Sequence, residues 1–210
     1  MKGVTFNVSV LHFLLAKSVG RVTDSALFGL LSGVKMRDFP EPELPGPDWL
    51  EIEVISGGIC GSDISNVTYS ASPAMEPFGS FPAVLGHEIL GRVKSVGNSV
   101  SKVSQGQRVT MDPMISCTTR GYPPGDACPS CSEGLHCTCE RAGEEGITLI
   151  GGRPLSRGLT IGYHRDLPGG WGQTVLAHES QVFAVADALT DNAAVLMLQA
   201  VQTVAVDLAA

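Results

Sequence analysis

The cysteines of this 210-residue chain are clustered in a way that favours metal binding. All but one of the six lie in a segment rich in Gly, Pro and Ser, at Cys117, Cys128, Cys131, Cys137 and Cys139. Cysteines that only fill a core have no reason to gather among turn-forming residues, and the Cys-x2-Cys spacing is typical of zinc sites. Four thiolates satisfy a tetrahedral zinc ion, so we expect one here, with Cys139, Cys137 and His136 as alternatives for the last ligand.

A second possible metal site involves residues nearer the N-terminus. The segment Gly58-Ile59-Cys60-Gly61-Ser62-Asp63 carries a thiol, a hydroxyl and a carboxyl group, and Gly86-His87-Glu88 carries an imidazole and another carboxyl group. If the fold brings Cys60 and His87 together, they supply two ligands of a zinc site that can keep a position open for substrate. Taken singly, such a cysteine is more often a small core residue and such a histidine a structural or surface residue.

Short strands with irregular connections must position these residues. The pattern LEIEVI, starting at Leu50, alternates apolar and charged residues and stops at Gly57-Gly58, which predicts a half-buried strand. Further strands are expected at 89–96, 107–111, 173–178 and 181–185. The predicted fold class is therefore mainly β (β-rich α+β), with one domain over 49–190. Within it, residues 112–170 form a turn-rich segment, here called the cysteine lobe, which needs a metal to hold its shape.

The two ends of the chain differ from this domain. The Pro-rich stretch 38–47 cannot form a helix or a central strand, so residues 1–48 are predicted to be a lead-in segment on the surface. After Thr190, a suitable N-cap, residues 191–210 contain no helix breaker and are apolar on nearly every face. We expect a helix that leads toward a further domain, or that associates with another copy to form a homo-oligomer.

Charge and hydropathy exclude some partners. The 14 basic and 21 acidic residues give a net charge of −7 without a basic cluster, so nucleic acid is not expected as a partner. No apolar run approaches the roughly 18 residues of a membrane span, and no membrane association is expected. The apolar N-terminus is short and lacks a clean cleavage site for secretion. A cytoplasmic location, where thiols stay reduced, is therefore expected.

Several motifs together resemble the N-terminal catalytic domain of the zinc-dependent medium-chain alcohol dehydrogenases. They are GICGSD, GHEILGRVKSVGNSVSKVSQGQRV, the cysteine lobe and GGWGQTVLAHESQVFAVADALTDNAAVL, which follow one another in the order of that family over about residues 30–205. The run GHExxGxxxxxGxxVxxxxxGxRV is specific to it. The resemblance implies a GroES-like, partly open β-barrel with a zinc-binding loop lobe and a C-terminal helix.

The resemblance also implies roles for the residues of the second site. Cys60 and His87 would bind a catalytic zinc ion, and Glu88 matches a glutamate that can approach the metal when ligands exchange. Ser62 would be the hydroxyl that hydrogen-bonds a substrate alcohol and passes its proton on. Asp63 matches a carboxylate that accepts the other ring N–H of His87 and fixes its tautomer.

In the cysteine lobe, the resemblance implies a structural zinc site formed by four cysteines. Cys128, Cys131 and Cys139 are in register with the family pattern, and Cys117 replaces a first cysteine that the family usually has at the position of Gly125. The assignment of Cys139 as the last ligand depends on this resemblance.

Three features depart from the family pattern. Leu198 occupies the position of the third catalytic-zinc ligand and cannot bind a metal, although Glu88 could complete the site. Ser65 stands where a histidine commonly extends the proton relay. No GxGxxG fingerprint follows a strand, so the domain that would bind NAD or NADP is absent from the sequence.

Two interpretations follow from the sequence. The first is an NAD(P)-linked, zinc-dependent dehydrogenase of small-molecule alcohols, polyols or the corresponding carbonyls. It would be present only as a truncated catalytic domain, inactive without its cofactor domain. The alternative is a non-catalytic, zinc-binding GroES-like module or decayed paralogue. The missing cofactor fingerprint and Leu198 favour this alternative.

Overall fold

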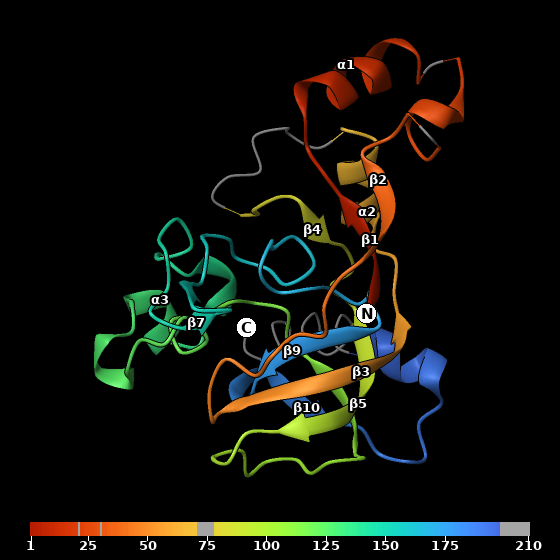
Figure 1. Cartoon of the computed structure of the whole chain (residues 1–210). Coiled ribbons are helices and arrows are strands. Elements are labelled where there is room, and N and C mark those ends of the chain that lie inside the picture. The colour runs from red at the N-terminus through yellow and green to blue at the C-terminus, as the bar shows by residue number, and fades with distance from the viewer. Residues whose placement is uncertain (21, 30, 71–77, 198–210) are drawn as a thin grey trace, which may run out of the picture.

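A five-stranded antiparallel sheet forms the lower part of the molecule in Figure 1. The computed structural model describes residues 1–20, 22–29, 31–70 and 78–197. The sheet has the order β10-β6-β5-β3-β9, formed by β3 (Trp49–Gly57), β5 (Ile89–Val96), β6 (Arg108–Met111), β9 (Thr174–His178) and β10 (Val182–Ala184). These strands fall where the sequence predicted strands. Within the described residues the sheet keeps two unpaired edges, β9 and β10, as expected of a partly open barrel.

The core beneath this sheet is shared with the cysteine lobe. Leu50 and Ile52 of β3 are buried, and the next residue, Glu53, is exposed. This agrees with the predicted alternation along the strand. Lobe residues Ile115 and Leu155 belong to the same buried cluster. The sheet and the lobe therefore bury part of their apolar surface against each other.

The first 48 residues contribute a second, smaller sheet. It has the order β2-β1-β4, formed by β1 (Lys2–Phe6), β2 (Val34–Asp38) and β4 (Ala83–Val84). Between β1 and β2 the chain forms α1 (Val10–Ser18) and η1 (Asp24–Ala26), which extend away from the main sheet at the top of Figure 1. Residues 39–48 contain no helix or strand. The segment for which the sequence indicated only a lead-in thus includes two strands, and Phe6 anchors them in a buried cluster.

The remaining elements are short. α2 (Gly61–Val67) follows Cys60, and η4 (Glu179–Gln181) joins β9 to β10. The cysteine lobe contains η2 (Pro124–Asp126), α3 (Pro129–Ser132), η3 (His136–Thr138) and the two-stranded β7 (Leu149–Ile150) and β8 (Arg153–Pro154). It projects to one side of the main sheet (Figure 1). Among the helices in the described ranges, none is long and apolar enough to cross a membrane.

The C-terminal helix begins where the sequence predicted it. Residues 191–197 are helical, and the hydroxyl of Thr190 accepts a hydrogen bond of 3.3 Å from the backbone N–H of Ala193, as an N-cap does. Ala194 and Val195 are buried against the rest of the domain. The rest of the predicted helix lies outside the described residues. This includes Leu198 and the surface expected to mediate association.

Candidate functional site

Cys60, His87 and Glu88 converge although they come from separate parts of the chain. Their ligand atoms all lie within 4.8 Å of one another. Cys60 is the N-cap of α2, and His87 and Glu88 lie directly before β5. His87 and Glu88 are buried and Cys60 is partly exposed, which leaves the group accessible from the thiol side.

Asp63 links the thiol segment to the imidazole. Its carboxylate is fully buried, and Oδ2 accepts a 2.9 Å hydrogen bond from the backbone N–H of Cys60. Oδ1 lies 3.5 Å from Nδ1 of His87, which makes no hydrogen bond within the described residues. Desolvation lowers the pKa of His87, but Asp63 and Cys60 outweigh it and hold the pKa above its ordinary value. Because Asp63 faces Nδ1, Nε2 is the nitrogen available to a metal.

The surroundings of Cys60 lower the pKa of its thiol. Desolvation raises its pKa, but hydrogen bonds from Ser62 and the imidazole of His87 outweigh this and bring the pKa below its ordinary value. A thiolate is the form that binds metal ions. The electrostatics of this group therefore suit a cation.

Tyr163 completes the group and was missed by the sequence reasoning. Its hydroxyl lies 2.8 Å from Oδ1 of Asp63 and 3.0 Å from Oγ of Ser62, and its ring centroid is 5.3 Å from that of His87. Tyr163 is distant from Ser62 and Asp63 in sequence and belongs to no recognisable motif. The only local signal is the adjacent Gly162, which marks a close approach of two backbones.

Glycines make the convergence possible. Gly162 has a φ of +89°, and a Cβ there would lie 2.5 Å from the carbonyl oxygen of Gly86. This contact brings Tyr163 against the segment that carries His87. A Cβ at Gly58 would overlap the carboxylate of Glu88, so a glycine is also required where β3 ends beside that side chain.

The second group is formed by Cys117, Cys128, Cys131 and Cys139, whose sulfur atoms lie within 4.8 Å of one another. Backbone N–H groups point at these sulfurs. The N–H of Cys117 donates to Sγ of Cys131, that of Cys128 to Sγ of Cys117, and that of Cys131 to Sγ of Cys128, each at 3.4 Å. All four thiols are free. Such N–H donors stabilise thiolates before any metal binds.

The thiol pKa values of the four-cysteine group shift in opposite directions. Desolvation raises the pKa of the Cys128 thiol, but backbone N–H groups of Cys131 and Glu140 outweigh it and lower the pKa to about 7. Burial raises the pKa of Cys131 and of Cys139. Adjacent thiolates repel one another, so all four ionise together only when a cation sits between them.

The structure also shows where the other two candidates for the last ligand, Cys137 and His136, lie relative to the four-cysteine group. Cys137 is exposed and outside the group. His136 lies with Nδ1 3.7 Å from Oδ2 of Asp112, and is likewise outside it. The structure brings Cys139, and neither alternative, to the other three cysteines.

Both groups have the chemistry of zinc sites. Thiolate sulfur, imidazole nitrogen and carboxylate oxygen are the usual protein ligands of zinc. In the part of the chain that is described, these are the two groups of ligand side chains close enough to hold a metal ion. The buried thiols of the cysteine lobe also lack disulfide partners, which fits a metal rather than an oxidised pair.

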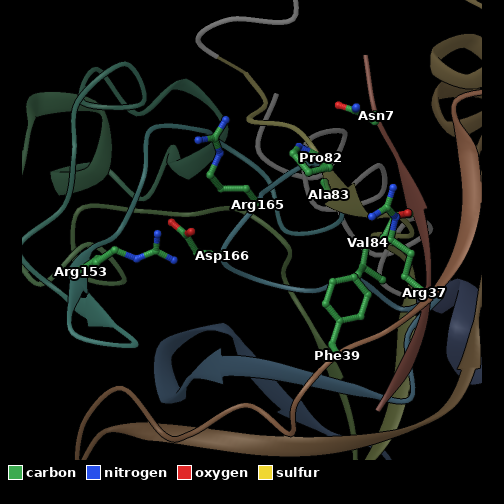
Figure 2. Close-up of a pocket in the computed structure, with 10 residues that line it drawn as sticks. Asn7, Arg37, Phe39, Pro82, Ala83, Val84, Arg153, Arg165 and Asp166 are labelled. Carbon is green, nitrogen blue, oxygen red and sulfur yellow. The ribbon is translucent and has the colours of Figure 1, made fainter. Parts of the chain in front are cut away.

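A separate pocket of about 440 Å³ lies beside β4 (Figure 2). Figure 2 shows Arg153 and Asp166 on one side of it and Arg37 and Phe39 on the other. The lining includes a third arginine, Arg165, but no thiol or imidazole. With a single carboxylate, this pocket is basic and is not a third metal site.

Comparison with known proteins places the chain in a family. Residues 46–187 match the family model described as the alcohol dehydrogenase GroES-like domain. L-galactonate-5-dehydrogenase of Escherichia coli K12 is 33% identical over 134 residues, which cover 64% of this chain and 34% of that protein. An uncharacterised zinc-type alcohol dehydrogenase-like protein of Haemophilus influenzae is 37% identical over 122 residues, covering 58% of this chain and 32% of that protein.

A solved structure gives the same result. The putative zinc-binding dehydrogenase of Sinorhizobium meliloti 1021, bound to NADP, has a TM-score of 0.55 and 27% identity over 93% of this chain and 41% of its own. The chain spans about a third of the length of the curated relatives it matches. Because the family model matches residues 46–187, more than half of the chain, the protein belongs to the alcohol dehydrogenase GroES-like domain family.

Proposed function

We propose that this domain provides the zinc site of an NAD(P)-linked dehydrogenase of small alcohols, polyols or the corresponding carbonyls. The observation that carries the proposal is the convergence of Cys60, His87 and Glu88 within 4.8 Å, with Asp63 behind the imidazole. These three residues would hold the catalytic ion. A bound zinc ion lowers the pKa of an alcohol or polarises a carbonyl.

The hydroxyl of Tyr163 holds Ser62 beside Asp63. It donates to Oδ1 of Asp63 at 2.8 Å, and it can also donate to Oγ of Ser62 at 3.0 Å. Ser62 is exposed, so its hydroxyl can form a hydrogen bond with a substrate hydroxyl.

The four cysteines of the lobe would hold a second, structural zinc ion. Their N–H···S hydrogen bonds form a cage with four sulfur ligands, the closed coordination typical of structural sites. Because the sequence contains no GxGxxG fingerprint, we propose that the nicotinamide cofactor is bound by a domain other than this one.

The alternative is a non-catalytic, zinc-binding GroES-like module or decayed paralogue. The four-cysteine group supports it, since that group alone could hold the fold. Zinc content separates the two proposals. We expect two zinc ions per chain, one for each group, in protein purified without chelators, and one in the double variant C60S/H87A.

The matched control is C128S, which should lose the other ion and keep the one at Cys60. One zinc ion in both the wild type and C60S/H87A would favour the module. With the domain that binds the nicotinamide cofactor also present, zinc-dependent reduction of NAD⁺ or NADP⁺ with a panel of alcohols and polyols, abolished in C60S/H87A, would support the dehydrogenase.

A further inference from the structure

Arg120 is a buried cation without an ionic partner in the described structure. Its side chain is 0% exposed and is the largest of the fully buried side chains. Nη1 donates a 2.9 Å hydrogen bond to the carbonyl of Glu144 and Nη2 donates to the carbonyl of Gly158, but Nε has no partner within the described residues. No carboxylate there forms an ion pair with it. A buried guanidinium needs compensation, because removing a charge from water is costly.

Arg120 is hydrogen-bonded on both sides to neighbours of the buried thiols of the lobe. Its backbone N–H donates to the carbonyl of Ser116, the residue before Cys117, at 3.0 Å. Its Nη2 donates to the carbonyl of Gly158, which precedes Leu159, and Leu159 lies in one buried cluster with Cys117 and Cys139.

Burial lowers the pKa of Arg120, and Cys139 and Cys117, when ionised, counteract this. His164 is also near, but burial lowers its pKa to about 4, so it stays neutral at ordinary pH and contributes no charge. The compensating negative charge must then come from the thiolates.

The metal-bound cysteine group has such a charge to offer. Four thiolates around one zinc ion, the structural site proposed above, leave a net charge of −2 in a buried setting. Cys117 is fully buried and Cys139 is 5% exposed, so water screens this charge poorly on the side of Arg120. Each charge is therefore costly to bury without the other.

The backbone of the lobe holds Arg120 in place from both ends. Its own carbonyl accepts hydrogen bonds from the N–H groups of Ile147 at 2.7 Å and Thr148 at 3.0 Å. Its guanidinium is fixed on carbonyl groups of two further lobe residues. Arginine suits this position because it remains charged when buried and presents several donors in a rigid plane.

We infer that Arg120 is the counter-ion of the metal-bound four-cysteine group and increases its affinity for zinc. The inference rests on the proposed structural zinc site and adds to it a residue that binds no metal itself. Zinc and Arg120 should then be thermodynamically coupled. Loss of Arg120 should reduce the stability that zinc contributes, and loss of zinc should reduce the stability that Arg120 contributes.

The test measures zinc transfer from the whole chain to a chromophoric chelator, in an H87A background that leaves the four-cysteine site. R120M should lower the zinc affinity by about tenfold or more, the usual effect of removing a group that supports metal ligands. R120K, which keeps the charge, should retain most of the affinity. R153M is the matched control, since Arg153 is an exposed arginine of the same lobe, and should match the parent.

A second readout is the melting temperature with and without chelator. Removing zinc should lower it more in the parent than in R120M, because the parent is left with an unpaired buried cation. Equal zinc affinity and equal chelator effects in the parent and R120M would overturn the inference, as would equal losses in R120M and R120K. If R120M does not fold, R120Q is measured in the same way, with the same two outcomes. A parent that holds no zinc would instead refute the structural site.

Discussion

At the scale of single residues, carboxylate and carbonyl oxygens, which accept hydrogen bonds and cannot donate them, hold neighbouring polar groups in place. The carboxylate of Asp63 accepts hydrogen bonds from the N–H of Cys60 and from the hydroxyl of Tyr163. His164 follows the same logic. Its Nδ1 accepts from the N–H of Asp166 at 3.2 Å, so Nε2 must donate to the carbonyl of Ser156 at 2.9 Å.

Replacing Tyr163 with phenylalanine should destabilise the domain. The ring would remain against His87, but the buried Asp63 would lose a donor, at a cost of about 1–3 kcal/mol in the free energy of unfolding. Urea denaturation followed by circular dichroism measures this. Y122F serves as control because the hydroxyl of Tyr122 makes an exposed hydrogen bond, to Glu145. Equal midpoints for Y163F and the wild type would show that the hydroxyl has no structural role.

His164 should make the domain sensitive to acid. Burial lowers its pKa from 6.5 to about 4, and both ring nitrogens are satisfied only in the neutral form. The unfolded chain therefore binds a proton more readily between these values. Stability from this group is complete above about pH 7 and falls by roughly 3 kcal/mol as the pH drops to 4.

The variant H164Q tests this assignment. Its free energy of unfolding should depend less on pH than that of the wild type between pH 7 and 4, since zinc release at low pH affects both proteins alike. The measurement is a series of urea titrations across this range. Parallel pH profiles for the two proteins would assign the acid sensitivity to other groups.

At the scale of elements, glycine contacts between loops position the site more than any single strand does. β5 begins directly after His87 and Glu88, and β3 ends at Gly57, so the two neighbouring strands place both ligand segments at one end of the sheet. Gly162 then lets the loop that carries Tyr163 reach the backbone of Gly86.

The substitution G162A should disturb this contact. Its positive φ and the 2.5 Å approach to Gly86 make a Cβ unfavourable, and we expect a loss of about 1–3 kcal/mol in stability. The variant should also bind less metal at Cys60 and His87. G125A is the control, since that position has open space and no positive φ. The free energy of unfolding and the zinc content check both expectations; a G162A variant as stable as G125A would contradict them.

At the scale of the whole molecule, the cysteine lobe and the sheet are energetically connected. Ile115, Leu155, Ile161 and Leu167 of the lobe pack in the same buried cluster as the strands of the main sheet. The lobe itself contains only short helices and one small hairpin, so we expect its shape to depend on a metal ion held by the four cysteines.

Removing zinc should therefore destabilise the entire domain and not the lobe alone. We expect a strong chelator to lower the melting temperature by several degrees or more, in one cooperative transition. C128S should melt at a similarly reduced temperature without chelator, and C137S, which alters the exposed cysteine outside the group, should melt like the wild type. Circular dichroism measures all three; a zinc-loaded protein that melts unchanged after chelation would show that the lobe holds its shape without metal.

The sequence by itself determined the features that are local in the chain. Alternation of apolar and charged residues predicted β3, because a strand with one buried face repeats every second residue. Short apolar runs between Gly, Ser or Asn predicted the other strands of the main sheet. The Cys-x2-Cys pair is also a local spacing, and it predicted a metal site because one tight turn can place both thiols on one ion. The motifs around Cys60 and His87 indicated the family that the comparison then showed.

Only the tertiary structure decided the features that depend on residues far apart in the chain. It brought Cys139 rather than Cys137 to the other three cysteines, brought Tyr163 to Asp63 and Ser62, and bonded Arg120 to a carbonyl next to the cluster that contains the thiols. It also formed two strands from the first 48 residues, whose pairing partners carry no local pattern. The physical reason is that such contacts come from backbone approach and shared burial, which leave no periodic spacing in the sequence.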